Sequence, residues 1–371
     1  MRRILVLICA AAAAVLLATV SPASAAGGWT VQYPPFPAGS INSSLNGVSC
    51  ATASTCIAVG SYYVSASNTN FSLADKWNGS SWVLQTTPNP SGSVLTQFSA
   101  VSCPATTSCE AVGSYSTNIQ SAGTTLAERW NGTAWAIQST PTLTGGGYLD
   151  GVSCPSASLC IAVGNFNNTD HNLAEEWNGT AWSEQTIPAG SDTLSSVSCP
   201  STTYCVAVGA TFVDKPYALI WNGSTWKSVS VPAPAGELSG LAAVSCFSAS
   251  ACTATGSGLT SSGQNNLVER WNGTKWVIQT APNQGASSQL TAVSCPSASS
   301  CTAIGNTGGA RGATLAEGWN GSTWTIETTP APNGPSAPEA ISCTAVTTCT
   351  STGEYFPNDG GTTDSLAYQL N

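Results

Sequence analysis

Residues 125–141 read TLAERWNGTAWAIQSTP, and close copies of this stretch recur along the chain. The copies are SLADKWNGSSWVLQTTP (72–88), NLAEEWNGTAWSEQTIP (172–188), YALIWNGSTWKSVSVP (217–232), NLVERWNGTKWVIQTAP (266–282) and TLAEGWNGSTWTIETTP (314–330). A repeat of this length predicts an array of similar supersecondary units that bury their apolar faces against one another.

A second recurring pattern, Leu-x-x-Val-Ser-Cys-x5-Cys-x-Ala-Val-Gly, precedes each copy and occurs once more near the C-terminus. Its seven versions start near Leu45, Phe98, Leu149, Leu194, Leu241, Leu290 and Pro338. Together the two patterns contain four short apolar segments bounded by Gly, Pro, Asn or Ser, which is typical of β-strands. Four-stranded units of this size predict an all-β fold, a seven-bladed β-propeller with four antiparallel strands per blade.

An Asn-Gly dipeptide separates the third and fourth predicted strands of six units. Asn-Gly favours a two-residue hairpin turn, because both turn positions need a positive φ. With that turn, Trp130 would lie opposite Thr133 and Glu128 opposite Trp135. The same Asn-Gly-Ser/Thr is formally a glycosylation acceptor, but its presence in every complete copy favours the turn.

The two ends of the repeat array are incomplete in a complementary way. The seventh unit stops at SLAYQLN (365–371), and GGWTVQYPPFP (27–37) resembles the missing end of a unit. Aligned in this way, Trp29 takes the position of Trp135. We therefore expect the segment from Trp29 to Tyr33 to be the outermost strand of the seventh blade, paired with Leu366–Leu370.

Residues 1–25 have the features of a signal peptide. Arg2 and Arg3 precede an apolar run from Ile4 to Val20, and small residues 22–25 follow. A membrane anchor is the weaker interpretation, because the run is short and no stop-transfer charge follows it. We expect residues 26–371 to form one secreted propeller domain, with no membrane span once the signal is removed.

The remaining 14 cysteines form seven Cys-x5-Cys pairs, and we predict that each pair is a disulfide. The pairs are Cys50 with Cys56, Cys103 with Cys109, Cys154 with Cys160, Cys199 with Cys205, Cys246 with Cys252, Cys295 with Cys301, and Cys343 with Cys349. Zinc is the alternative, but the spacing is not that of a zinc knuckle and His171 is the single histidine.

Charge is scarce, with 7% charged residues against about 25% in ordinary domains. Without Arg2 and Arg3 the formal net charge changes from −9 to −11. This acidic balance, with no basic stripe, argues against nucleic acid as a partner. No motif points to a cofactor or a metal, and we expect a monomer.

Residues that recur in most units are interpreted as parts of the scaffold. They include the serine before the first cysteine of each pair, the paired tryptophans and an acidic position. The acids of that position are Asp75, Glu128, Glu175, Glu269 and Glu317. The alternative is that these acids are catalytic carboxylates. An acid repeated in five blades favours the structural role of an inter-blade hydrogen-bond acceptor.

Function is expected where the units differ. In a propeller of this connectivity the disulfide loop and the Asn-Gly turn share one face, and the variable loops after the second strand share the other. The candidate ligand-binding residues on that variable face are Tyr62, Tyr63, Tyr115, Phe166, Asp170, His171, Phe212, Asp214, Arg311, Tyr355 and Asp359. Aromatic rings beside Asn, Ser and Thr suit sugars; alternatively, the rings seal the core between blades.

Enzymatic motifs are few. His171 could pair with Asp170, but no Gly-x-Ser-x-Gly nucleophile motif is present. A glycosidase needs two convergent carboxylates. The candidates in variable segments are Asp150, Asp170, Asp192, Asp214, Glu237, Glu339, Glu354, Asp359 and Asp364. The turn 358–364 could hold calcium, but it lacks the spacing of an EF-hand loop.

Where VSCPSASLCIAVG (152–164) is followed by LAEEWNGTAW (173–182), the chain resembles the repeat of secreted, actinobacterial-type propeller proteins. The resemblance covers nearly all of residues 26–371. It implies the seven-bladed fold and identifies no catalytic residue. We therefore expect a secreted binding scaffold for glycans or a cell-surface partner. A glycoside hydrolase or lyase, or a structural envelope protein, is the alternative.

Overall fold

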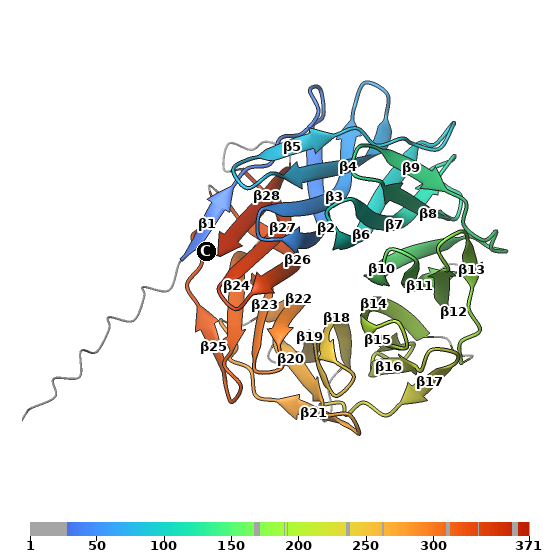
Figure 1. Ribbon diagram of the computed structural model, residues 1–371. Helices are drawn as coiled ribbons and strands as arrows, with labels where there is room; N and C mark the ends of the chain where they lie inside the picture. The colour runs from blue at the N-terminus through green and yellow to red at the C-terminus, as the bar shows by residue number, and fades with distance from the viewer. Residues whose placement is uncertain are drawn as a thin grey trace, which may run out of the picture.

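The computed structural model describes residues 28–166, 171–188, 190, 192–234, 238–261, 263–285, 287–308, 312–332, 334–357 and 363–370. The regular structure in these residues is all β-strand. Seven four-stranded antiparallel sheets stand like blades around a common axis (Figure 1). The predicted seven-bladed β-propeller is confirmed. Within these ranges, no helix is long and apolar enough to cross a membrane.

Each blade runs outward from the axis through four strands. The innermost strands are β2 (Asn42–Thr52), β6 (Leu95–Ala105), β10 (Gly147–Ser156), β14 (Asp192–Ser201), β18 (Leu238–Ser248), β22 (Ser288–Ser297) and β26 (Ser336–Ala345). The second strands are β3 (Thr55–Val64), β7 (Ser108–Ser116), β11 (Leu159–Phe166), β15 (Tyr204–Thr211), β19 (Ala251–Thr260), β23 (Ser300–Thr307) and β27 (Thr348–Tyr355).

The third strands carry the Leu-Ala-Glu-x-Trp part of the repeat, and the outermost strands are short. The third strands are β4 (Thr69–Trp77), β8 (Thr124–Trp130), β12 (His171–Trp177), β16 (Pro216–Trp221), β20 (Gly263–Trp271), β24 (Ala313–Trp319) and β28 (Asp364–Leu370). The outermost strands are β5 (Trp82–Gln85), β9 (Trp135–Gln138), β13 (Trp182–Glu184), β17 (Trp226–Val229), β21 (Trp276–Gln279), β25 (Trp324–Glu327) and β1 (Trp29–Gln32).

The Asn-Gly turn is longer than predicted. In blade 2, Trp130 pairs with Trp135, so the loop contains four residues instead of two. The Asn131 side chain accounts for the difference. Its Oδ1 accepts hydrogen bonds from the backbone N–H groups two and three residues later, at 2.9 and 3.0 Å, while Gly132 takes a φ of 99°. This side-chain cap stabilises a wider loop and brings the two tryptophan rings to 5.8 Å between centroids.

The N-terminal strand closes the ring as predicted. Trp29 of β1 pairs with Leu370 of β28, and the two strands lie side by side in Figure 1. The closing strand also contacts both neighbouring blades. The Trp29 indole donates to Glu327 of blade 6 at 2.9 Å, and Gln32 accepts from Trp82 of blade 1 at 2.8 Å. Blade 7 therefore joins the first and last strands of the array.

All seven predicted disulfides are present, and each one joins the first and second strands of a single blade, with Cα–Cα separations of 3.9 to 4.1 Å. Seven disulfides indicate a protein that matures in an oxidising compartment. The bonds join Cys50 to Cys56, Cys103 to Cys109, Cys154 to Cys160, Cys199 to Cys205, Cys246 to Cys252, Cys295 to Cys301, and Cys343 to Cys349.

The second cysteine of each pair is buried in the core, with at most 2% of its surface exposed. These residues are Cys56, Cys109, Cys160, Cys205, Cys252, Cys301 and Cys349. Buried in this way, the seven sulfur bridges belong to the scaffold, and a ligand could not reach these second cysteines from solvent.

The serine before each first cysteine links one blade to the next. Its Oγ accepts a hydrogen bond of 2.9 to 3.0 Å from the backbone N–H of the first cysteine in the following blade. The donor and acceptor pairs are Cys103–Ser49, Cys154–Ser102, Cys199–Ser153, Cys246–Ser198, Cys295–Ser245, Cys343–Ser294 and Cys50–Ser342. The last pair joins blade 1 to blade 7, so the chain of bonds is a closed circle.

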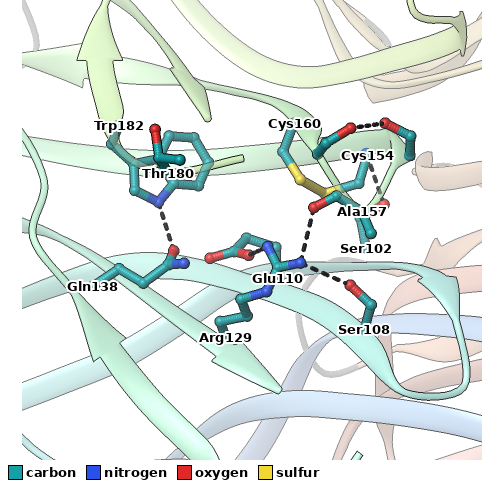
Figure 2. A network of polar contacts seen from close by, with 12 residues as sticks. Ser102, Ser108, Glu110, Arg129, Gln138, Cys154, Ala157, Cys160, Thr180 and Trp182 are labelled. Carbon is teal, nitrogen blue, oxygen red and sulfur yellow. Dashed lines mark hydrogen bonds and ion pairs between the residues drawn. A yellow bond between two sulfur atoms is a disulfide. The ribbon is translucent and has the colours of Figure 1, made fainter. Parts of the chain in front are cut away.

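The outer strands add further links between blades, and Figure 2 shows those between blades 2 and 3. Arg129 reaches across the interface and donates to the carbonyl oxygen of Ala157 at 2.8 Å, and it lies 3.4 Å from the Glu110 carboxylate of its own blade. The Trp182 indole donates to Gln138 at 2.7 Å. These contacts explain why repeated Arg, Trp and Gln residues serve the scaffold.

The apolar core lies between blades. One cluster joins Ile57 and Val59 of blade 1 to Phe98, Leu126 and Trp135 of blade 2, all of them buried. Equivalent clusters join the other neighbouring blades. An isolated blade would expose both of its faces to solvent. Each blade therefore depends on its two neighbours to bury most of its apolar surface.

The repeated acid is fully buried at the blade interfaces. Asp75, Glu128, Glu175, Glu269 and Glu317 are each 0% exposed. Burial raises the pKa of the first four to about 8, and that of Glu317 to about 7. Glu317 accepts a hydrogen bond from Asn266 of the preceding blade at 2.7 Å, so the predicted inter-blade acceptor is confirmed for Glu317. Among the described residues, the carboxyl oxygens of Asp75, Glu128 and Glu269 have no hydrogen-bond partner, so the prediction is not confirmed for these three. The protonated form of the first four groups is therefore favoured at neutral pH.

Replacing one serine of the closed circle should destabilise the propeller. In Ser153→Ala the N–H of Cys199 loses its acceptor, and we expect the free energy of unfolding to fall by about 1–3 kcal/mol. Denaturant unfolding measures the change. The control is Ser156→Ala, whose hydroxyl only contacts the exposed Ser158; equal stability losses in the two variants would contradict the assignment.

Raising the pH should also destabilise the fold. Unfolded Glu269 titrates near its ordinary pKa of 4.5, whereas burial raises the folded pKa to about 8. The stabilisation is therefore complete below the unfolded pKa and is lost as the pH rises through the folded one. We expect the melting temperature to be lower at about pH 9 than at about pH 5. The uncharged Glu269→Gln variant should lose less over this range, and an identical loss would refute the mechanism.

Candidate functional site

The loops after the second strands and the linkers between blades share one face of the ring, called here the variable face. This follows from the antiparallel order of each sheet, because the first-to-second and third-to-fourth connections then lie at the opposite end. The disulfide loops and the Asn-Gly turns occupy that opposite face. The variable face was predicted to carry the ligand site, and it holds the cavities described below.

Most of the predicted aromatic residues lie at the edge of the core on this face. Tyr62, Tyr115, Phe166 and Tyr355 end or nearly end their second strands, and each packs against an inter-blade apolar cluster. Phe212 differs, because 76% of it is exposed. The first four rings therefore seal the core, which leaves only their outward edges for a ligand.

The predicted residues on blades 3 and 4 lie apart from those on blade 1. The His171 ring lies 5.2 Å from that of Phe166, and both line a cavity of about 260 Å³. Asp214 follows Phe212 in a tight turn with a φ of 51°. Asp170, Arg311 and Asp359 lie outside the described residues, as does most of the acidic turn 358–364.

A β-bulge in every innermost strand places one extra residue in the wall of the axial channel. The register with the second strand shifts between Leu149 and Gly151 in blade 3 and at the same place in the other blades. An extra residue at a bulge changes the direction of its side chain. The bulged residues Asn46, Ser99, Asp150, Ser195, Ala242, Thr291 and Glu339 line an axial channel of about 210 Å³.

Blades 3 and 7 place carboxyl groups in this channel wall. In blade 3, Asp150 accepts a hydrogen bond from Asn165 at 2.9 Å. In blade 7 the equivalent positions hold Glu339 and Glu354. Burial raises the pKa of Glu339 to about 7, and the nearby Glu354 charge acts in the same direction. Two carboxyl groups therefore come together in blade 7, although the chain sequence separates them by a hairpin.

Glu354 also lines a pocket of about 440 Å³ between blades 7 and 1, called here the 7–1 pocket. The pocket gathers two predicted ligand residues with small polar groups. Its lining residues are Asn42, Ser43, Ser44, Ser61, Tyr62, Tyr63, Asn70, Glu354 and Thr363. Among the predicted residues that the structure describes, Tyr62 and Tyr63 are the tyrosines that share a pocket with a carboxylate.

Fixed contacts shape the walls of the 7–1 pocket. Asn42 Oδ1 accepts from the backbone N–H of Thr363 at 3.0 Å, which ties blade 1 to blade 7. The Tyr62 ring stacks on Phe71 at 5.4 Å between centroids, and the Tyr63 hydroxyl donates to Asn68 at 2.8 Å. The Asn42 and Tyr63 side chains and the Tyr62 ring are therefore held in place before a ligand arrives.

A larger cavity of about 630 Å³ lies between blades 6 and 7, beside the linker that contains Pro330, Pro332 and Pro335. None of its described lining residues is aromatic. Its carboxylate, Glu327, already accepts the hydrogen bond from Trp29. In the described part of the chain, no group of three or more His, Cys, Asp or Glu residues could hold a metal ion.

Sequence reasoning missed six of the nine residues that line the 7–1 pocket. Asn42 begins β2 and Thr363 directly precedes β28, and only ring closure brings these distant parts of the chain together. Asn70 is the second residue of β4, directly after the loop of blade 1 that varies between units, and could have been included. Glu354 and Glu339 were candidate carboxylates, but nothing in the sequence showed that they meet.

No family model and no curated protein matches the sequence. Similar solved structures do exist. YCF48 bound to D1 peptide has a TM-score of 0.59 and 13% identity, covering 94% of this chain and 97% of that chain. The GH74 xyloglucanase from Xanthomonas campestris has a TM-score of 0.56 and 11% identity, covering 89% of this chain and 54% of that chain.

A third similar structure is the SapL1 lectin in complex with alpha methyl fucoside. Its TM-score is 0.50 and its identity 11%, covering 81% of this chain and 98% of that chain. These identities are low, so the likeness shows the propeller fold alone.

Proposed function

We propose that this protein is a secreted propeller that binds glycans in the 7–1 pocket. One observation supports this most directly: tyrosine rings and hydroxyl, amide and carboxylate groups line a single cavity. Sugar rings offer apolar C–H faces for aromatic contact and hydroxyl groups for directional hydrogen bonds. Secretion is supported by the seven disulfides and by the signal-like residues 1–25, which lie outside the described residues.

The arrangement of polar groups suits a neutral or weakly polar ligand of sugar size. Ser61 and Asn70 are half-buried beside Tyr62 and Tyr63. Their polar atoms can therefore form hydrogen bonds to a ligand without exposing the buried apolar core to solvent. A pocket whose groups are already ordered loses little conformational entropy when the ligand binds. The arrangement of polar groups in the 7–1 pocket therefore favours the binding of a sugar-sized ligand.

A second candidate function, glycoside hydrolysis, is supported by the Glu339–Glu354 pair. Hydrolysis of a glycosidic bond uses one carboxylic acid as proton donor and one carboxylate as nucleophile or base. Two carboxyl groups with raised pKa values beside a polar pocket could divide these roles. Release of reducing sugar that is lost in Glu354→Gln would favour this function.

A glycan array with the protein of residues 26–371 tests the binding proposal. We expect binding to a defined set of glycans, weakened by at least about tenfold in Tyr63→Ala and in Asn70→Ala, because each removes a wall of the 7–1 pocket.

The control for the array is His171→Ala, on a different blade, which should bind as the wild type does. Melting curves check that the variants fold. An array without binding, or binding that His171→Ala weakens as much as Tyr63→Ala, would rule out the 7–1 pocket. A structural envelope protein would then be the better explanation.

A further inference from the structure

The Glu354 carboxylate faces the 7–1 pocket without a compensating charge. It is half-buried, and burial raises its pKa. Among the described residues, no hydrogen bond or ion pair to its side chain is formed. Its electrostatic neighbour is Glu339, which carries the same sign of charge. Lost hydration therefore destabilises the Glu354 carboxylate, and its charge adds to the burial that raises the pKa of Glu339.

Basic residues in the described part of the chain do not relieve this repulsion. Lys76, Arg129 and Arg270 lie over tryptophan rings of neighbouring blades, at 4.8 to 5.5 Å from the ring centroids. Lys227 and Lys275 belong to the outermost strand and the Asn-Gly turn of their blades, and Lys215 to blade 4. Of the described lining residues of the 7–1 pocket, none is Lys or Arg.

The equivalent site in blade 3 shows how the fold satisfies the carboxyl group at the position of Glu339, because Asp150 corresponds to Glu339 and Asn165 corresponds to Glu354. There the Asn165 amide donates to Asp150. Blade 7 replaces that amide by the Glu354 carboxylate, so a donor is missing and a negative charge is added. A ligand that brings a positively charged donor to Glu354 would supply both the donor and the opposite charge.

We propose that the 7–1 pocket selects amino sugars, sugar units with a free, protonated amine, over their N-acetylated and acidic counterparts. This inference rests on the proposed glycan-binding function. The ammonium group pairs with Glu354, while Tyr62 and Tyr63 contact the ring and Asn70 and the serines bond its hydroxyl groups. An ammonium donates up to three hydrogen bonds, and a half-buried ion pair is screened less than an exposed one.

The overall charge acts in the same direction. The acidic balance of the chain repels acidic polysaccharides and attracts cationic ones. General attraction of this kind does not depend on one residue. Selective binding in the 7–1 pocket does depend on one residue, Glu354. General attraction and selective binding can therefore be separated by comparing a substitution of Glu354 with a substitution of a carboxylate outside the pocket.

The test measures affinities for three oligosaccharides of equal length that carry a free amine, an N-acetylated amine or a carboxylate. Titration calorimetry at mildly acidic pH keeps the sugar amine protonated. We expect the wild type to bind the amine form at least about tenfold more tightly than the N-acetylated form, and the acidic form most weakly. In Glu354→Gln the preference for the amine form over the N-acetylated form should disappear.

The matched control is Glu184→Gln, which removes an exposed carboxylate from β13 of blade 3. It should keep the full amine preference. If Glu184→Gln and Glu354→Gln reduce the preference equally, the attraction is general and the inference is wrong. Equal binding of amine and N-acetylated forms, both weakened by Tyr63→Ala, would overturn the inference but leave the proposed function standing. If none of the three sugars binds, the proposed function fails as well.

Discussion

The circle of hydrogen bonds from cysteine N–H to serine Oγ is the constraint on which the other features depend. It joins all seven innermost strands, and the bond from Cys50 to Ser342 completes it. Because each bond has nearly the same length, the spacing between blades is nearly uniform. The width of the axial channel and the alignment of blade 7 with blade 1 follow from this spacing. The bond lies beside a disulfide in every blade, so donor and acceptor stand on the most strongly restrained hairpin.

Much of the fold could be predicted because the repeat specifies local structure seven times. Strand order, the cysteine pairs and closure by Trp29 all follow from aligning the units. The turn length did not. Asn-Gly predicts a two-residue loop from backbone preferences, but the Asn131 side chain bonds the following N–H groups and stabilises a four-residue loop. The Asn131 side chain thus selects one of the two turn lengths that an Asn-Gly dipeptide allows.

The candidate site was predicted only in part. Tyr62 and Tyr63 could be found because they stand where units differ, at the end of a second strand. The meeting of Glu339 and Glu354 could not, because it depends on a bulge. Alternation along a strand predicts that neighbours point to opposite faces, and an inserted residue breaks that rule without a distinctive sequence. Loops and linkers from distant parts of the chain complete the pocket.

Every disulfide in the described residues lies within one blade, so no covalent bond other than the chain itself crosses an interface. The disulfides therefore stabilise each of the seven blades separately, and noncovalent contacts hold neighbouring blades together in the ring. Under tension at the N-terminus, β1 can peel from β28 while all seven sulfur bridges remain intact. The resistance of β1 to peeling then depends on the noncovalent contacts of a four-residue strand, its two tryptophan bonds among them, whatever the redox state of the cysteines.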